Sequence, residues 1–122
     1  MQRPLRLRRK EDFARLRASG RVWRHPFVIL SVAPNDLPHN RYGFITGKRL
    51  GNAVRRNRVR RLLREAVRQA HPALRSGHDM VFIARDAIAG QPFASVQEAV
   101  TTLLRRAGLW EDEPGESEGR AE

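Results

Sequence analysis

The residues best suited to chemistry in this sequence lie in one basic segment, residues 48–68, which reads KRLGNAVRRNRVRRLLREAVR. Nine of its 21 residues are Lys or Arg, and Glu65 is its only acid. A guanidinium group is a planar donor that grips phosphate through paired hydrogen bonds, so this density of arginine favours a polyanion as ligand. A solvated helix face usually mixes both signs of charge. Nucleic acid is therefore the expected partner, and solubility or an anionic lipid surface is the less favoured alternative.

The charge of the whole chain leads to the same expectation. The 122 residues carry a net charge of +11, and this charge is unevenly distributed. Residues 1–110 hold 23 bases and 7 acids, whereas residues 111–122 hold six acids and one base. A body with such an excess of positive charge repels itself until a polyanion compensates it. We expect one nucleic-acid-binding domain over 1–110, beginning with a basic arm over 1–10, and an acidic disordered tail over 111–122.

The sequence offers few residues for an active site made of protein side chains. It has no cysteine, which excludes disulfides, thiolate zinc sites and cysteine nucleophiles. Its four histidines lack paired metal spacing, its acids are scattered, and residues 43–49 (GFITGKR) fail the spacing of a phosphate-binding P-loop. No apolar run approaches the roughly 20 residues of a membrane span. These observations predict a soluble, cytoplasmic protein with no metal of its own.

The basic segment must be positioned by a small set of helices and strands. Hydrophobic periodicity predicts helices over 11–19, 52–71 and 95–107, and strands over 21–25, 27–32, 41–46 and 79–85. This order predicts an α+β sandwich with helices packed on a small sheet. We expect strand 41–46 to pair antiparallel with strand 27–32. The helix between strands 41–46 and 79–85 indicates a parallel pair, whose crossover would be right-handed by the general rule.

Sequence signals at the helix ends specify how the basic helix is held. Asn52 is expected to cap its start and His71-Pro72 to end it. Gly20 is expected to stop the first helix, and Ser95 with Glu98 to form a capping box for the last. Within the basic helix, one side is apolar and the opposite side is basic. The expected apolar seam consists of Val59, Leu62, Leu63, Ala66 and Ala70.

Segment 48–68 resembles the signature of the bacterial ribonuclease P protein subunit, whose R-N-R core corresponds here to Arg56-Asn57-Arg58. The agreement continues on both sides, through Glu11-Asp12-Phe13 with Gly20, Arg41-x-Gly43 and Asp79-x-Val81-x-Ile83-Ala84-Arg85, and covers about residues 5–107. The resemblance implies an α-β-β-β-α-β-α sandwich of the ribosomal protein S5 domain 2-like type. It also implies a left-handed β-α-β crossover, against the general rule.

The resemblance implies a ribonucleoprotein endonuclease of tRNA processing, in which an RNA subunit requires Mg²⁺ and carries the chemistry. The protein would bind that RNA and the 5′ leader of precursor tRNA, with no bound cofactor, no membrane and no obligate protein partner. By position, the residues expected to bind the catalytic RNA are Lys48, Arg49, Asn52, Arg56, Asn57, Arg58, Arg60, Arg61, Arg64 and Arg68. Those expected in a leader cleft between the sheet and the basic helix are Phe13, Arg17, Leu30, Tyr42 and Phe44.

The leader cleft departs from the family pattern at two positions, because Arg17 and Leu30 stand where many members have aromatic residues. Leader binding would then depend more on charge and less on base stacking, which contributes about 1–3 kcal/mol per base.

Two other classes of function remain as rivals. A general single-strand RNA-binding protein would bind many RNAs alike, and a protein-only nuclease would cleave precursor tRNA without an RNA cofactor.

Overall fold

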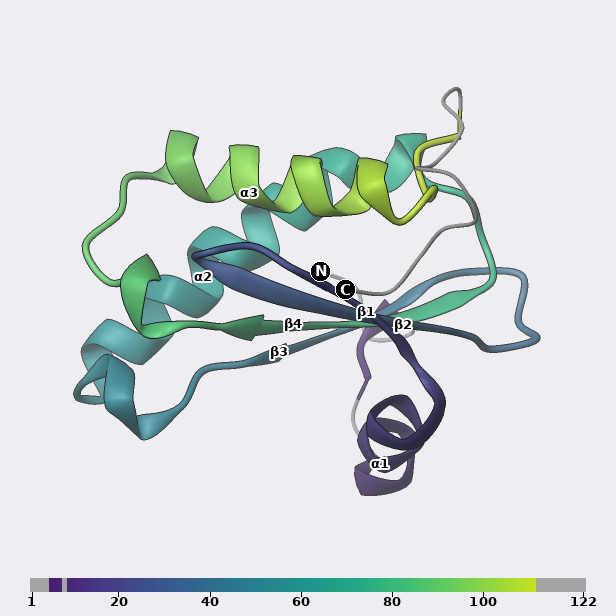
Figure 1. Ribbon diagram of the computed structural model, residues 1–122, viewed down its shortest axis with the longest axis horizontal. Coiled ribbons are helices and arrows are strands. Elements are labelled where there is room, and N and C mark those ends of the chain that lie inside the picture. The colour runs from purple at the N-terminus through teal and green to yellow at the C-terminus, as the bar shows by residue number, and fades with distance from the viewer. Residues whose placement is uncertain (1–4, 8, 112–122) are drawn as a thin grey trace.

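The fold follows the expected order of helices and strands (Figure 1). The computed structural model describes residues 5–7 and 9–111. The elements are α1 (Lys10–Ser19), β1 (Arg21–Arg24), β2 (Val28–Pro34), β3 (Arg41–Ile45), α2 (Ala53–Ala70), β4 (His78–Ala84) and α3 (Phe93–Arg106), with short 3₁₀ turns η2 (Lys48–Leu50), η3 (His71–Ala73) and η4 (Asp86–Ile88). Among these described residues, no helix is long and apolar enough to cross a membrane.

The four strands form one sheet in the order β1-β2-β4-β3. β2 is antiparallel to both β1 and β4, and β3 runs parallel to β4. The expected parallel pair is confirmed, but the expected pairing of strand 41–46 with strand 27–32 is wrong because β4 lies between them. Four consecutive residues of β4 are buried, and a strand that is buried on both faces belongs in the centre of a sheet.

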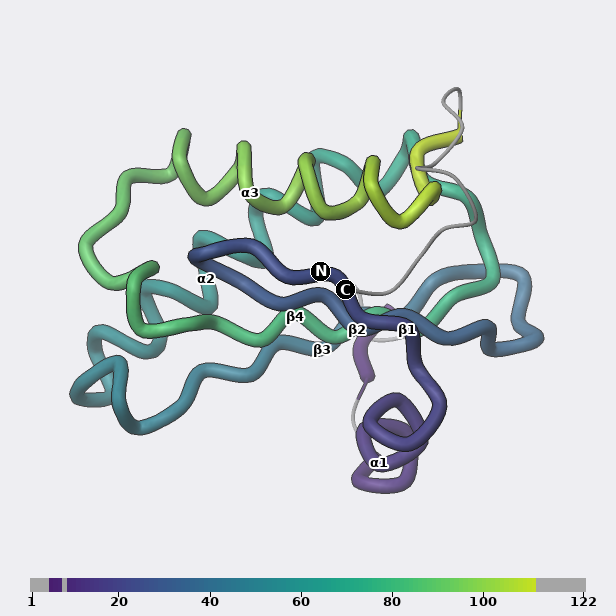
Figure 2. Tube along the Cα trace, viewed as in Figure 1, coloured from purple at the N-terminus to yellow at the C-terminus, as the bar shows by residue number. Residues whose placement is uncertain are grey.

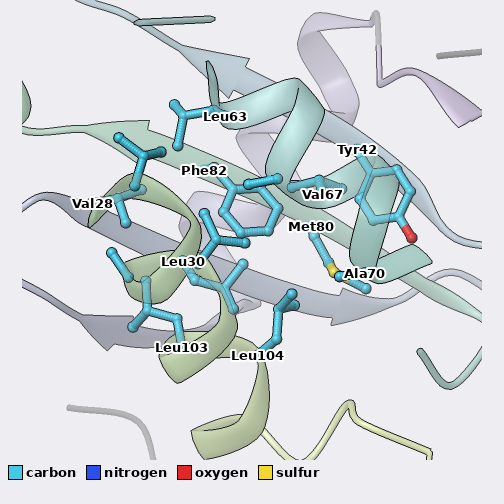
Figure 3. Packing of buried hydrophobic residues seen from close by; sticks show 14 of the residues in the cluster. Val28, Leu30, Tyr42, Leu63, Val67, Ala70, Met80, Phe82, Leu103 and Leu104 are labelled. Atoms are coloured by element: carbon cyan, nitrogen blue, oxygen red, sulfur yellow. The ribbon is translucent and has the colours of Figure 1, made fainter. Parts of the chain in front are cut away.

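The helices cover the two faces of the sheet unequally, as Figure 2 shows. α2 and α3 pack together on one face, here called the inner face, whereas α1 alone lies on the outer face. The main core fills the space between the inner face and the two helices (Figure 3). Leu30, Leu63 and Phe82 have no exposed surface there, and each such burial contributes roughly 1.5–3 kcal/mol. In the apolar seam of α2, Val67 is buried and Leu62 is only half-buried.

α1 approaches the outer face at two glycines. A Cβ on Gly43 of β3 would lie 2.8 Å from the Phe13 ring, and a Cβ on Gly20 would lie 2.6 Å from Oγ of Ser31. α1 ends before Gly20 as expected, but the φ of Gly20 is −73°, which any residue can adopt. A Cβ there would also overlap the carbonyl oxygen of Leu16, so the glycine is required by these two close contacts, with the last turn of α1 and with β2, and not by a left-handed helix stop.

The two ends of α2 agree with the sequence signals. The Asn52 side chain accepts a hydrogen bond from the backbone N–H of Arg55 at 3.0 Å, which caps the helix start. α2 ends at Ala70, and the chain continues into η3. The capping box expected for α3 is wrong, because this helix begins at Phe93 after Pro92, which places Ser95 inside its first turn.

The segment before α1 lies along the free edge of β3. The backbone N–H of Leu7 donates to the carbonyl of Tyr42 at 2.8 Å, and Arg6 forms a parallel bridge with the same residue. Residues 1–4 and 8 of the expected basic arm, and residues 112–122 of the expected acidic tail, lie outside the described residues. Leu74 and Trp110 form an antiparallel bridge near the end of the described chain.

Candidate nucleic-acid interface

One side of α2 and the η2 turn before it present the expected RNA-binding residues to solvent. The buried side of α2 packs on the sheet and α3, which fixes the direction of the opposite, basic side. The exposed members of this set are Lys48, Arg49, Asn52, Asn57, Arg58, Arg61 and Arg68, and the half-buried members are Arg56, Arg60 and Arg64. All ten predicted positions are therefore placed at the surface.

The basic side of α2 is hollowed, and the hollow continues toward β3. Asn57, Arg60, Arg61 and Arg64 line a shallow concavity of about 430 Å³. Arg60 and Arg64 also line a smaller hollow of about 140 Å³. The other residues of that smaller hollow are Arg6, Leu7, Phe13, Tyr42, Gly43 and Phe44. The basic surface of α2 and the aromatic residues near β3 are thus one continuous surface.

The arginines at this junction are held in place and repel one another. Arg60 donates to Oγ1 of Thr46 at 2.6 Å and to Oδ1 of Asn57 at 2.9 Å, so its guanidinium is oriented before any ligand arrives. Burial, together with the charges of Arg6 and Arg60, lowers the pKa of Arg64. A phosphate placed among these like charges would relieve their repulsion.

Two of the predicted RNA-binding arginines already have acidic partners. Arg68 pairs with Glu65 at 2.6 Å, and hydrogen bonds from Arg68 and Gln69 lower the pKa of Glu65 to about 2. Arg49 lies 3.3 Å from Asp86 in an exposed pair. Exposed pairs of this kind contribute little to stability, so both arginines can exchange their partner for phosphate at small cost.

The predicted leader-cleft aromatics come together but differ in accessibility. Tyr42 is 1% exposed, and its hydroxyl is hydrogen-bonded to His71 and Asn40. Phe44 stacks on Phe82 with its centroid 5.8 Å away, and the guanidinium carbon of Arg64 lies 5.9 Å from the Phe44 ring. The half-buried ring of Phe13 lies beside Gly43, at the edge of the hollow.

The prediction that Leu30 lines the cleft is wrong. Leu30 is 0% exposed and lies in the inner-face core, near Leu103 and Leu104 of α3 (Figure 3). Side chains alternate across a strand, so its neighbours Ile29 and Ser31 point to the outer face instead. Leu30 therefore lies on the opposite side of the sheet from Ile29 and Ser31.

The outer face carries a groove that sequence reasoning missed. Its volume is about 280 Å³, and Phe13, Leu16 and Arg17 of α1 form one wall. The floor and the remaining wall consist of Val22, Arg24, Ile29, Ser31, Ile45, Val81 and Ile83. The groove therefore lies between the sheet and α1, not between the sheet and α2. Phe13 lines both this groove and the hollow beside α2, so the two are neighbours.

Comparison with known proteins agrees with the resemblance in segment 48–68. The family model described as Ribonuclease P matches residues 1–108. The chain belongs to the ribonuclease P protein family. It is 45% identical over 112 residues to the ribonuclease P protein component of Herpetosiphon aurantiacus, covering 92% of this chain and 91% of that protein. It is 49% identical over 110 residues to the component of Roseiflexus castenholzii, covering 89% and 90%.

Solved structures of ribonuclease P proteins share the fold. The protein of Staphylococcus aureus matches with a TM-score of 0.81 at 25% identity, over 87% of this chain and 97% of that one. The protein of Thermotoga maritima matches with a TM-score of 0.77 at 28% identity, over 83% and 96%. The α+β sandwich implied by the resemblance is confirmed, and its left-handed β3–α2–β4 crossover stands against the general right-handed rule.

Proposed function

We propose that this chain is the protein subunit of a ribonucleoprotein ribonuclease P. In this role it binds the catalytic RNA through the basic side of α2, and it binds the 5′ leader of precursor tRNA through the neighbouring hollow and groove. The observation that carries the proposal is the continuity of these surfaces. Arg60 and Arg64 belong both to the basic side of α2 and to the hollow at Phe13.

The dimensions and chemistry of the groove suit a single strand of RNA. Its floor is apolar, which favours contact with unstacked bases, and Arg17 and Arg24 border it with positive charge. With Tyr42 and Leu30 buried, stacking depends mainly on Phe13. Charge and apolar contact along the sheet supply the rest of the leader affinity.

The protein's contribution to cleavage is electrostatic and positional. It reduces the repulsion between two RNA polyanions and holds the leader, while the RNA subunit binds Mg²⁺ and carries the chemistry. Asp12 of α1 forms an ion pair with Arg41, and Asp79 of β4 forms ion pairs with both Arg41 and Arg15. We place this assembly in the cytoplasm, where it would remove leaders from precursor tRNAs.

Reconstitution tests the proposal directly. The chain is mixed with a bacterial ribonuclease P RNA at near-physiological Mg²⁺, and release of the leader from precursor tRNA is measured with and without it. We expect cleavage only when both subunits are present. Cleavage by the chain alone would identify a protein-only nuclease, and equal binding of unrelated RNAs without stimulation would identify a general RNA-binding protein.

A further inference from the structure

A buried carboxylate lies where α1 meets the outer face. The side chain of Asp79, at the start of β4, is 0% exposed. Arg41 of β3 donates to both of its oxygens, at 2.9 and 2.7 Å, and Asn35 donates at 2.9 Å. Arg15 of α1 completes the cluster through a hydrogen-bonded ion pair with Asp79.

This cluster connects α1 to three other parts of the chain. Besides Asp79, Arg15 donates to the carbonyl of Pro34 at the end of β2 at 3.1 Å. Arg41 also reaches back to Asp12 of α1 at 3.4 Å. Burial raises the pKa of Asp79, but the hydrogen bonds from Arg41 and Asn35 and the nearby positive charges outweigh it, so the pKa lies below its ordinary value. The carboxylate is therefore charged at neutral pH, when both ion pairs are formed.

The cluster and the groove occupy successive parts of the same sheet face. Asp79, Val81 and Ile83 alternate along β4, so all three side chains point to the outer face. α1 covers the Asp79 end of this face, and Ile83 remains in the floor of the groove. The position of α1 thus decides the distance of its groove residues, Phe13 and Arg17, from that floor.

We infer that Asp79, Arg15 and Arg41 are positioning residues for leader binding, which act by holding α1 at the distance from the sheet that a single RNA strand requires. This inference rests on the proposed function. Arg15 and Arg17 then have different roles although they are two residues apart on one helix. Arg15 is committed to the buried carboxylate of Asp79, whereas Arg17 lines the groove, where its guanidinium would bind phosphate.

The salt dependence of leader binding distinguishes these two roles. Holoenzymes are reconstituted with wild-type protein, Arg15→Gln, Arg15→Lys or Arg17→Gln. Their affinities are then compared for precursor tRNA with a long leader and with a leader of a single nucleotide. Arg15→Gln should lower the preference for the long leader by about tenfold, because small misplacements of binding groups have large effects. The dependence of the leader affinity of Arg15→Gln on salt concentration, its salt slope, should equal that of the wild type. Arg15→Lys keeps the ion pair with Asp79 and should therefore retain most of the wild-type preference for the long leader.

Arg17→Gln provides the matched comparison, because it should reduce the salt slope by about 0.7 for the phosphate contact it loses. A reduced slope in Arg15→Gln would show that Arg15 itself contacts RNA and would overturn the inference. An unchanged leader preference in Arg15→Gln would also overturn it. Absence of any leader preference in the wild-type holoenzyme would instead contradict the leader-binding part of the proposed function.

A second measurement examines α1 without relying on the leader. Asp79→Asn removes the charge while keeping the shape of the side chain, and Glu98→Gln on α3 makes the same charge change at an exposed position. In the holoenzyme, Asp79→Asn should speed hydrogen exchange of the α1 amides selectively. The exchange rates of the α2 and α3 amides, and the affinity for the catalytic RNA, should equal those of Glu98→Gln. Unchanged exchange in α1, or equal acceleration throughout the fold, would contradict a specific role in holding α1.

Discussion

At the scale of single residues, the arginines of α2 differ in what holds them before RNA arrives. Arg60 is oriented by Thr46 and Asn57, Arg68 is paired with Glu65, and Arg58 makes only a long hydrogen bond of 3.4 Å to the carbonyl of Gln91 among the contacts described. Arginines that are oriented in advance lose less side-chain freedom on binding. Arg58 of the R-N-R core is instead an exposed donor whose contribution is mainly charge.

Replacing Arg56 and Arg58 together by Ala should weaken assembly with the catalytic RNA. Each lost phosphate contact should reduce the salt slope of binding by about 0.7–0.9, because fewer counterions are released. Filter binding over a series of salt concentrations measures the slope. Arg21→Ala is a suitable control, since β1 forms the edge of the sheet opposite β3. If the double variant has the wild-type salt slope, these two arginines do not contact the phosphates of the catalytic RNA.

Tyr42 predicts a specific alkaline response. Burial raises the pKa of its hydroxyl to about 12, even though the hydrogen bond from Asn40 acts in the opposite direction. The unfolded chain ionises this phenol near pH 10, so stability should fall between about pH 10 and 12 as the unfolded state releases the proton first. Tyr42→Phe should cost about 1 kcal/mol at neutral pH and lack this part of the alkaline loss. Urea unfolding at several pH values compares the two proteins.

At the scale of elements, α1 depends on close contact with the sheet. Gly43 allows the Phe13 ring to lie directly on the backbone of β3, and Gly20 allows the end of α1 to approach Ser31. A second small cluster, of Leu7, Leu16, Ala33 and Val81, fills the space beneath the helix. Since α1 forms one wall of the groove, its packing links the stability of the fold to the proposed binding of RNA.

Gly43→Ala should therefore destabilise the protein by about 1–3 kcal/mol, because the new methyl group would overlap the Phe13 ring or displace α1. Gly47→Ala is the matched control, since a Cβ at Gly47 meets nothing within 4 Å. Thermal or urea unfolding measures both variants. Equal stability of the two would show that α1 adjusts without cost and that its contact with β3 is loose.

The elements also show how far sequence reasoning extends. Local signals were sufficient for α2, whose start depends on the Asn52 cap and whose end depends on Pro72. They failed where the outcome depends on distant contacts. Nothing near Asp79 in the sequence indicates that Arg15 and Arg41, 64 and 38 residues away, will surround it. The resemblance alone does not say which face of the sheet Leu30 occupies, because side chains alternate between the two faces along a strand.

At the scale of the whole molecule, the excess positive charge acts on folding and on RNA binding in opposite ways. The net charge is +11, and residues 1–110 carry most of the bases. Repulsion among these charges destabilises the free protein, whereas the same charges attract RNA. The fold resists the repulsion through its apolar core, and through pairs such as Arg41 with Asp79.

Added salt should consequently have two opposite effects. Raising NaCl from low to physiological concentration should increase the free energy of unfolding of the free protein, because repulsion is screened over about 8–10 Å. The same change should weaken the complex with the catalytic RNA. Urea unfolding and filter binding in one buffer series measure both. A free protein that loses stability with added NaCl would show that ion pairs, and not repulsion, dominate its electrostatics.

The short segment at residues 5–7 has a consequence for how the molecule behaves in a crowded solution. An unpaired strand edge is a template on which another chain can add a strand, and this begins aggregation. Leu7 bonds to the backbone of Tyr42 and so occupies part of the outer edge of β3. The other edge, β1, is only four residues long and carries Arg21 and Arg24. One edge is thus partly covered and the other is short and charged, which disfavours pairing of the sheet with that of a second molecule.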